Sequence, residues 1–162
     1  MDIKEGAQAL STGLECNRLF SISMKLRKLA LLLLVAYVIS GLGVQAAKRF
    51  VPRDRPGAVL AGVHYPYDII IRKQDILKGD NSFPSGHTSI TFAAATVAFL
   101  SIDSVWGFLI LLLAMLVGIS RVYLGVHYPS DVIAGMMLGI LSGYIALWIP
   151  VVRKKKKVGY RI

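Results

Sequence analysis

The segment Val132–Val152, VIAGMMLGILSGYIALWIPVV, decides the fold of this chain. It contains no charged side chain, and its only ionisable group is the phenol of Tyr144. A bilayer core about 30 Å thick needs roughly 20 apolar residues in a helix, so this segment is long enough to cross one. A surface helix of a water-soluble protein would carry a polar stripe, which this segment lacks. We therefore interpret it as a membrane span.

Three other apolar runs precede this segment. Leu29–Ala47, LALLLLVAYVISGLGVQAA, has only one strongly polar side chain, that of Gln45. The other two runs are shorter and need their polar flanks to reach the length of a full span. We therefore predict an all-α, polytopic membrane bundle with four spans, at about 29–47, 86–102, 105–121 and 132–152.

Two local patterns indicate how these helices pack. Only Asp103 and Ser104 separate the second run from the third, so these two helices should be antiparallel neighbours. Gly135, Gly139 and Gly143 recur at four-residue spacing in the last run. Small residues at this spacing let membrane helices approach closely, so they should form one packing face.

The composition supports a membrane protein. Of the 162 residues, 55% are hydrophobic and 17% are charged, whereas the net charge is +10. Soluble domains have about 45–50% apolar and about 25% charged residues, so disorder and an ordinary soluble domain are both disfavoured. The single cysteine, Cys16, excludes an intramolecular disulfide and a cysteine-based zinc site. We expect the membrane bilayer, and no nucleic acid, as the partner of this basic chain.

The basic residues also predict a division of the chain and its orientation. We divide it into an N-terminal segment (1–28), a membrane domain (29–152) and a basic tail (153–162). The first segment either forms an amphipathic surface helix or is a frayed polar tail, and it shows no signal peptide. Basic clusters flank the first and last spans, which places both termini in the cytoplasm of an integral, multi-pass cell-membrane protein.

The opposite face also carries basic residues, and this requires an explanation. Lipid head-group contact is one explanation, and an anion-binding site facing the outside is the other. The predicted topology brings three polar segments to that face, each at the end of a span. These segments are Lys48 to Pro56 with Arg55, the run Pro84-Ser85-Gly86-His87, and the stretch that holds Ser120, Arg121, His127 and Asp131.

The residue types in these segments suit phosphate chemistry. Lys48, Arg55 and Arg121 could together bind a phosphoryl group, because the arginine fork matches phosphate oxygens and lysine adds a point charge. A carboxylate four residues after His127 could orient that imidazole as a nucleophile or base. His87 could act as a general acid. Asp131 or Ser130 could in addition cap the last helix.

The pattern Lys-x6-Arg-Pro, Pro-Ser-Gly-His and Ser-Arg-x5-His-x3-Asp resembles the signature of the type 2 phosphatidic-acid phosphatase superfamily. All eleven specified positions match in order between Lys48 and Asp131. The resemblance implies a helical membrane enzyme that hydrolyses phosphate monoesters or diphosphates without a metal or cofactor. It implies His127 as the nucleophile that forms a phosphohistidine, Asp131 as its orienting group and His87 as the acid. It further implies that phosphate is held by Lys48, Arg55, Ser85, Gly86 and Arg121, with Pro56, Pro84 and Ser120 in support.

One feature departs from that family. Its membrane members usually have six spans, three of them before the first motif, whereas only 29–47 precedes it here. We therefore expect a bundle about two helices shorter than usual, and a homo-oligomer that covers its Gly-rich faces is an alternative to a monomer. Residues 57–83 are too polar to span and should lie over the site, where His64 is a weak third candidate.

Three functions are compatible with these residues. The first is a lipid phosphatase acting on an isoprenoid-carrier diphosphate or a phosphatidate-type lipid. The second is a lipid phosphotransferase that uses the same phosphohistidine. The third is a non-catalytic membrane protein that binds anionic lipids, which the complete set of motif residues disfavours.

Overall fold

A computed structural model describes the backbone of residues 3–59, 81–102 and 105–149, and side chains in these ranges from residue 20 onward, except those of 57 and 58. Within these ranges the chain is helical and contains no strand, which confirms the predicted all-α class. The helices are α1 (Ile3–Phe50), α2 (Pro56–Val59), α4 (Gly86–Ser101), α5 (Val105–Tyr123) and α6 (Pro129–Trp148).

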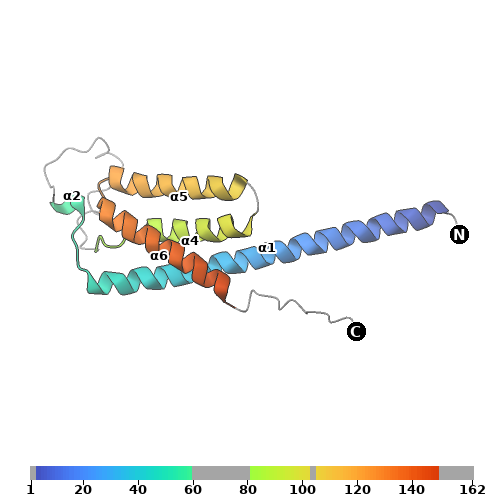
Figure 1. Cartoon of the computed structure of the whole chain (residues 1–162), viewed down its shortest axis with the longest axis horizontal. Coiled ribbons are helices and arrows are strands. Elements are labelled where there is room, and N and C mark those ends of the chain that lie inside the picture. Colours follow the sequence, from blue (N-terminus) through green and yellow to red (C-terminus); the bar gives the residue numbers. More distant parts are fainter. Residues whose placement is uncertain (1–2, 60–80, 103–104, 150–162) are drawn as a thin grey trace, which may run out of the picture.

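Helix α4 is the centre of the bundle. It packs against α1, α5 and α6, and α1 and α5 lie on opposite sides of it (Figure 1). Apart from Phe92, its buried residues are small or β-branched, including Ala93, Ala95 and Val97, so three neighbours can approach it closely. The packing of α4 against α5 confirms that these helices are neighbours, whereas the two residues that join them lie outside the described ranges.

The predicted glycine face of α6 lies directly on α4. A Cβ atom on Gly135 would lie 2.5 Å from the Ser85 carbonyl oxygen, and one on Gly143 would lie 2.9 Å from that of Ala93. A Cβ atom on Gly139 would collide with the carbonyl oxygen of Ser89. The three glycines are therefore buried in a helix–helix contact and not exposed, so they do not need a second copy of the chain to cover them.

A buried polar contact fixes α1 on the other side of α4. The hydroxyl groups of Ser40 and Ser89 are 2.8 Å apart, and both residues are fully buried. Such small hydroxyl pairs stabilise helix association in membranes, where an unpaired polar group has no water to bind. Leu32 and Ala36 of α1 add apolar contacts with Val97 of α4 further along the same interface.

Among the residues that the structure describes, three helices are long and apolar enough to cross a membrane, namely Phe20–Phe50 of α1, then α5 and α6. Much of their apolar surface points outward; Leu113 and Leu116 of α5, for example, are each 60% exposed. Such a surface is unfavourable in water and suits lipid. The chain is therefore an integral membrane protein.

The second predicted span is shorter than a full crossing. Helix α4 has 16 residues, which at 1.5 Å per residue is about 24 Å, less than the bilayer core of about 30 Å. By length and composition, three of the four predicted spans therefore qualify, and α4 lies enclosed among them. Residues 81–85, which precede α4, are not helical, and they form part of the site described below.

Helix α1 is longer than the predicted span 29–47. It is continuous from Ile3 to Phe50 and extends well past the rest of the bundle (Figure 1). The helix therefore crosses the boundary drawn between residues 28 and 29, and the proposed division of the chain stays a prediction. The side chains of the predicted amphipathic face and the basic tail 153–162 lie outside the described residues.

Replacing Gly139 with alanine should destabilise the bundle. Alanine favours a helix over glycine, but here its methyl group would push α6 away from the α4 backbone, and overpacking of this kind costs about 1–3 kcal/mol. Thermal unfolding in detergent should therefore shift to lower temperature. Gly41→Ala is the matched control, since nothing lies within 4 Å of a Cβ atom at that position. Equal midpoints for the two variants would contradict this description of the interface.

Candidate active site

The three polar segments meet at one end of the bundle around a cavity of about 440 Å³. Its mouth is polar, and it continues along α1 and α4 between less polar residues. The lining side chains that the sequence singled out are Lys48, Arg55, Gly86, His87, Arg121 and His127, and the others are Tyr37, Gly41, Val44, Gln45, Ile90 and Val126.

Three cations reach this cavity from three different elements. Lys48 lies in the last turn of α1, Arg55 immediately precedes α2, and Arg121 lies in the last turn of α5. None of the described residues that line the cavity is acidic. The Nε atom of Arg121 is buried and has no hydrogen-bond partner among the described residues. A buried donor of this kind is costly unless a ligand satisfies it, so the cavity suits an anion.

The two histidines differ in their surroundings. His87, the second residue of α4, is exposed at the cavity mouth, whereas His127, in the turn between α5 and α6, is 5% exposed. Burial and then the Arg55 charge lower the pKa of His127 from 6.5 to about 4, although the Asp131 carboxylate and a hydrogen bond with the Ser82 backbone act in the opposite direction. Because this pKa lies far below 7, the His127 ring is neutral at pH 7 and can act as a nucleophile.

Asp131 is close to His127 but does not touch it directly. Its Oδ2 atom lies 3.8 Å from Nδ1 of His127, beyond hydrogen-bond distance. The expected direct hydrogen bond is therefore absent, because other donors occupy the carboxylate. The hydroxyl of Ser82 donates to Oδ2 at 2.5 Å, and the backbone N–H of Tyr128 donates to the same oxygen at 2.9 Å. The Tyr128 contact confirms that Asp131 caps α6.

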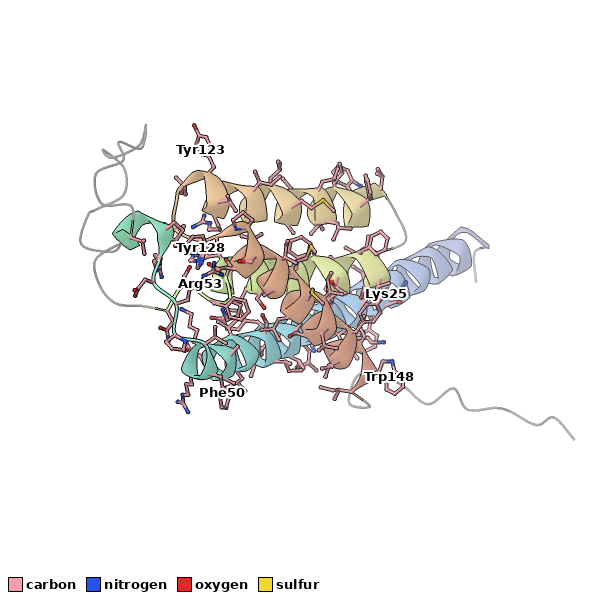
Figure 2. The ribbon with its side chains drawn as sticks, turned by 60° about the vertical axis from the view of Figure 1, so that its left-hand side comes forward. Lys25, Phe50, Arg53, Tyr123, Tyr128 and Trp148 are labelled. Atoms are coloured by element: carbon pink, nitrogen blue, oxygen red, sulfur yellow. The ribbon has the colours of Figure 1, made fainter. Side chains whose placement is uncertain are left out.

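Arg53 holds the other oxygen of this carboxylate. Its Nη1 atom donates to Oδ1 of Asp131 at 2.8 Å and to the Ser130 hydroxyl at 2.7 Å. The guanidinium also stacks on the Tyr128 ring, 4.0 Å from its centroid. Figure 2 places Arg53 and Tyr128 together at the end of the bundle that is remote from Lys25 and Trp148. Arg53 was not among the candidate site residues, although its position two residues before Arg55 was a visible signal.

Residues 81–85 connect all three motifs. The side-chain amide of Asn81 donates to the carbonyl oxygen of Lys48 at 2.6 Å. The N–H of Ser82 donates to the carbonyl oxygen of Arg53 at 2.7 Å, and that of Ser85 donates to the carbonyl oxygen of Asp131 at 3.0 Å. This short extended segment therefore ties the end of α1 to the start of α6. Ser82 was also not a candidate, since no motif includes it.

Besides Asp131, four of the predicted residues lie beside the cavity and do not line it. Ser85 is fully buried, and its hydroxyl contacts the Thr88 hydroxyl at 2.9 Å, so this N-cap residue of α4 makes no capping hydrogen bond with its side chain. Ser120 donates to the carbonyl oxygen of Val117 at 2.7 Å. Pro56 begins α2, and Pro84 is buried next to Ser85. His64 and most of the predicted covering segment lie outside the described residues.

The turn that carries His127 depends on one glycine. Gly125 has a φ of 63°, in the left-handed region that glycine adopts at little cost. The turn reverses the chain after Arg121 and buries His127 at the start of α6. In residues 3–59, 81–102 and 105–149, no group of three His, Cys, Asp or Glu side chains converges to hold a metal ion. Lys48, Arg55 and Arg121 together with the two imidazoles make the cavity suited to an anion.

Comparison with known proteins relates this arrangement to one family. A sequence model of the PAP2 superfamily matches residues 29–155. The chain is 38% identical over 110 residues to the bacitracin transport permease protein BcrC of Bacillus licheniformis, covering 65% of this chain and 54% of that protein. It is 31% identical over 140 residues to the undecaprenyl-diphosphatase of Sulfolobus acidocaldarius, covering 86% of this chain and 64% of that protein. The chain thus spans between half and two thirds of the length of these relatives.

Solved structures show the same fold. The crystal structure of Aquifex aeolicus LpxE is similar with a TM-score of 0.64 and 29% identity, over 84% of this chain and 76% of that one. A PAP2-type phosphatidylglycerolphosphate phosphatase from Bacillus subtilis has a TM-score of 0.56 at 23% identity, over 85% and 72% of the two chains. The arrangement of α1, α4, α5 and α6 is therefore shared with known membrane proteins.

Replacing Arg121 with glutamine should weaken oxyanion binding. A hydrogen bond to a charged group contributes about 1.5–3 kcal/mol, so the Kd for orthovanadate should rise roughly 10- to 100-fold. Calorimetry on the purified protein in detergent would measure this. Arg49→Gln removes the same charge from an exposed position that does not line the cavity and should bind as the wild type does. If both variants bind equally, the cavity is not the anion site.

Proposed function

Because this chain belongs to the PAP2 superfamily, we propose that it is a membrane lipid phosphatase that removes a phosphate group through a phosphohistidine at His127. The observation that carries the proposal is the position of a buried, neutral imidazole in the same cavity as three cations. Neutral imidazole has a free electron pair for attack, and the cations suit the charge of a phosphoryl group.

The first step transfers the phosphoryl group to the enzyme. Nε2 of His127 attacks phosphorus, a P–N bond forms, and the P–O bond to the leaving group breaks. His87, once protonated, donates its proton to the leaving oxygen; burial and the charges of the three cations lower its pKa, which makes this proton easier to release. Lys48, Arg55 and Arg121 stabilise the negative charge on the three equatorial oxygens of the transition state.

The second step returns His127 to its starting state. The neutral His87 left by the first step accepts a proton from water, and the resulting hydroxide oxygen attacks phosphorus. The P–N bond then breaks, phosphate leaves, and both histidines regain their starting protonation states. The free backbone N–H groups at the start of α4, including that of Gly86, add partial positive charge on the same side.

A lipid substrate suits the shape of the cavity. Beyond the cations it continues along α1 past Gln45 and Gly41 to Tyr37, at depths where α1 is otherwise surrounded by lipid. An amphiphile could therefore keep its phosphate at the polar end and its chain among apolar side chains. The name of the Sulfolobus acidocaldarius relative favours an isoprenoid diphosphate over a phosphatidate-type lipid. The proposed site faces the outside of the cell, with both termini in the cytoplasm.

Two other functions remain as alternatives. A lipid phosphotransferase would share the first step and replace water with a lipid alcohol in the second. A protein that only binds anionic lipids would use the cations but would not need a buried neutral imidazole. The histidine therefore favours an enzyme, and access to the acceptor distinguishes hydrolase from transferase.

His127→Ala should abolish phosphate release. Without the imidazole no P–N bond can form, so turnover should fall by at least three orders of magnitude if His127 is the nucleophile. The assay is phosphate release from an isoprenoid diphosphate in detergent micelles. The unfolding temperature should stay close to wild type, which shows that the variant is folded. Wild-type turnover in this variant would refute the assignment.

A substrate panel would separate the three functions. It contains an isoprenoid diphosphate, phosphatidate, phosphatidylglycerophosphate and a soluble sugar phosphate, each with and without a lipid alcohol as acceptor. Release of free phosphate without an acceptor supports the phosphatase, and appearance of a phosphorylated acceptor supports the transferase. Binding without turnover of any compound would support the non-catalytic alternative and contradict the proposal.

A further inference from the structure

The Ser82 side chain occupies the space between the two residues expected to form a direct pair. Its hydroxyl oxygen lies 2.5 Å from Oδ2 of Asp131 and 3.3 Å from Nδ1 of His127, whereas the carboxylate and the ring are 3.8 Å apart. Ser82 and Asp131 are both 0% exposed, so water does not compete for these contacts. The hydroxyl is therefore the only described group that bridges the two side chains.

We propose that Ser82 is a positioning residue that links Asp131 to His127 and fixes the imidazole with its proton on Nδ1. This proposal rests on the proposed function, in which Nε2 of His127 is the attacking atom. A hydroxyl group has one proton to donate and can also accept a hydrogen bond. An ionised carboxylate can only accept, so the Ser82 proton points to Asp131 and its oxygen accepts from His127.

This direction of donation decides which nitrogen is free. With Nδ1–H donating to Ser82, the electron pair of the neutral ring lies on Nε2, the nitrogen required for attack. Once Nε2 is phosphorylated the ring becomes cationic, and its Nδ1–H bond to Ser82 strengthens because the donor is charged. The Asp131 charge then stabilises the ring through the polarised hydroxyl.

The surroundings hold the hydroxyl in place. Its own backbone N–H is bound to the Arg53 carbonyl oxygen at 2.7 Å, and the Arg53 side chain fixes the far oxygen of Asp131. Tyr128 donates its N–H to the near oxygen at 2.9 Å. The carboxylate thus has little freedom to turn toward the ring, and Ser82 is the route by which it acts on His127.

The kinetic test compares Ser82→Ala with Ser82→Thr and with Ser89→Ala. Loss of a hydrogen bond to a charged group should lower kcat roughly 10- to 100-fold in Ser82→Ala, with KM changed less than about twofold, because phosphate binding uses other residues. Ser82→Thr keeps the hydroxyl and should recover most of the loss. Ser89→Ala removes a buried hydroxyl remote from the reaction and should keep wild-type kcat.

A second measurement does not depend on turnover. The chain has three histidines, so ¹⁵N NMR of labelled imidazoles can assign the tautomer of His127 by comparison with His127→Ala. We expect Nδ1–H in the wild type and a mixture of tautomers in Ser82→Ala, a change that leaves the Ser82 backbone intact. A wild-type ring protonated on Nε2, or unchanged kcat and tautomer in Ser82→Ala, would overturn the proposal. If the wild type shows Nδ1–H but releases no phosphate, the proposed function fails and the Ser82 contact stands.

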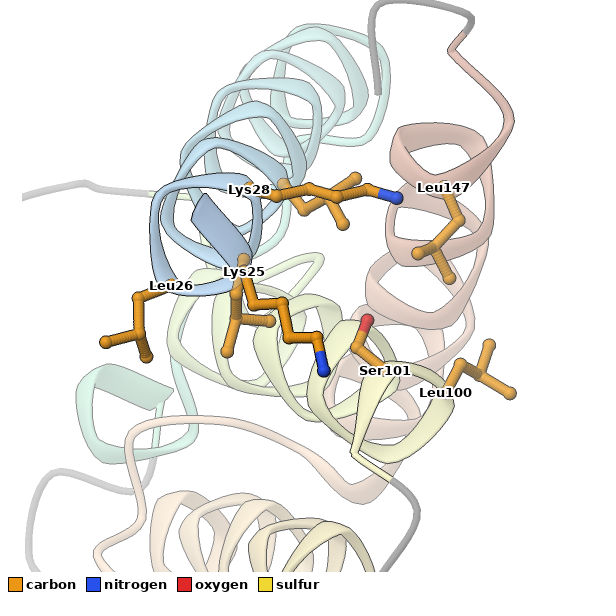
Figure 3. Close-up of a pocket in the computed structure, with 8 residues that line it drawn as sticks. Lys25, Leu26, Lys28, Leu100, Ser101 and Leu147 are labelled. Carbon is orange, nitrogen blue, oxygen red and sulfur yellow. The ribbon is translucent and has the colours of Figure 1, made fainter. Parts of the chain in front are cut away.

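A separate cavity lies at the other end of the bundle. Its volume is about 490 Å³, and it is lined by Lys25, Lys28 and Ser101 with Leu26, Leu29, Leu32, Leu100 and Leu147. Figure 3 shows the two lysine side chains extending from α1 across this cavity, Lys28 toward Leu147 of α6 and Lys25 toward Ser101 of α4. None of the described lining residues is acidic.

We infer that this second cavity binds an anionic phospholipid of the surrounding bilayer. Lys28 precedes Lys48 by 20 positions in the same helix, which is about 30 Å at 1.5 Å per residue and equals the thickness of a bilayer core. The lysines therefore lie at the level of the lipid head groups on the side opposite the candidate active site. Their charges suit a lipid phosphate, and the leucines suit the first part of an acyl chain.

The test compares lipid binding by lysine variants with binding by an arginine variant in the same helical turn, and each single variant removes one charge. Binding of phosphatidylglycerol and phosphatidylcholine to the purified protein would be measured by native mass spectrometry and by thermal stabilisation. Lys25→Ala/Lys28→Ala should weaken binding of phosphatidylglycerol roughly 10- to 30-fold, since each lysine near a lipid surface contributes about a factor of five. Arg27→Ala, an exposed residue that does not line the cavity, should change it much less.

Two results would overturn this second inference. One is an equal loss of phosphatidylglycerol binding in the arginine variant and in each single lysine variant. This result would mean that the lipid is attracted to any basic surface and not to this cavity. The other is equal binding of phosphatidylglycerol and phosphatidylcholine by the wild type. Neither result depends on phosphate release, so both are independent of the proposed function.

Discussion

The contact between the glycine face of α6 and the backbone of α4 is the constraint on which the rest of the structure depends. At Gly135 the α6 backbone approaches the Ser85 carbonyl oxygen, and the Ser85 N–H donates to the Asp131 carbonyl oxygen one turn away. Larger side chains on this face would separate the helices and with them the second and third motifs. Close packing of small residues therefore sets the position of His127 relative to the cavity, and no polar group of the site could do this alone.

The same packing explains which parts of the molecule could be predicted from the sequence. The apolar runs and the four-residue glycine spacing are regular patterns, so they indicated the helices and a packing face on α6, but not that α4 packs against this face. Topology then predicted that Lys48, Arg121 and the two histidines would share one end of the bundle. The roles of Ser82 and Arg53 depend on the path of an extended segment, and no spacing rule describes such a path. The predicted span 86–102 agrees closely with α4, whereas the continuity of α1 from Ile3 to Phe50 was not predicted.

The basic residues fall into groups with different surroundings. Lys48, Arg55 and Arg121 line one cavity together with His127, whereas Arg53 is bound to a buried carboxylate. Lys25 and Lys28, in the middle of α1, line a leucine-rich cavity at the other end of the bundle. The net charge of +10 on an apolar chain therefore has several explanations, since basic side chains can hold a reacting anion, fix a catalytic carboxylate or contact lipid.

The central claim is that His127 becomes phosphorylated during the reaction. The most direct test is to mix His87→Ala with an isoprenoid diphosphate, stop the reaction with alkali and locate the phosphoryl group by mass spectrometry. Loss of His87 slows the attack of water more than the first step for a good leaving group, so the intermediate should accumulate. The account predicts one phosphoryl group on His127, stable in alkali and lost in acid. A phosphoryl group on another residue, or turnover by this variant without any phosphorylated protein, would contradict it.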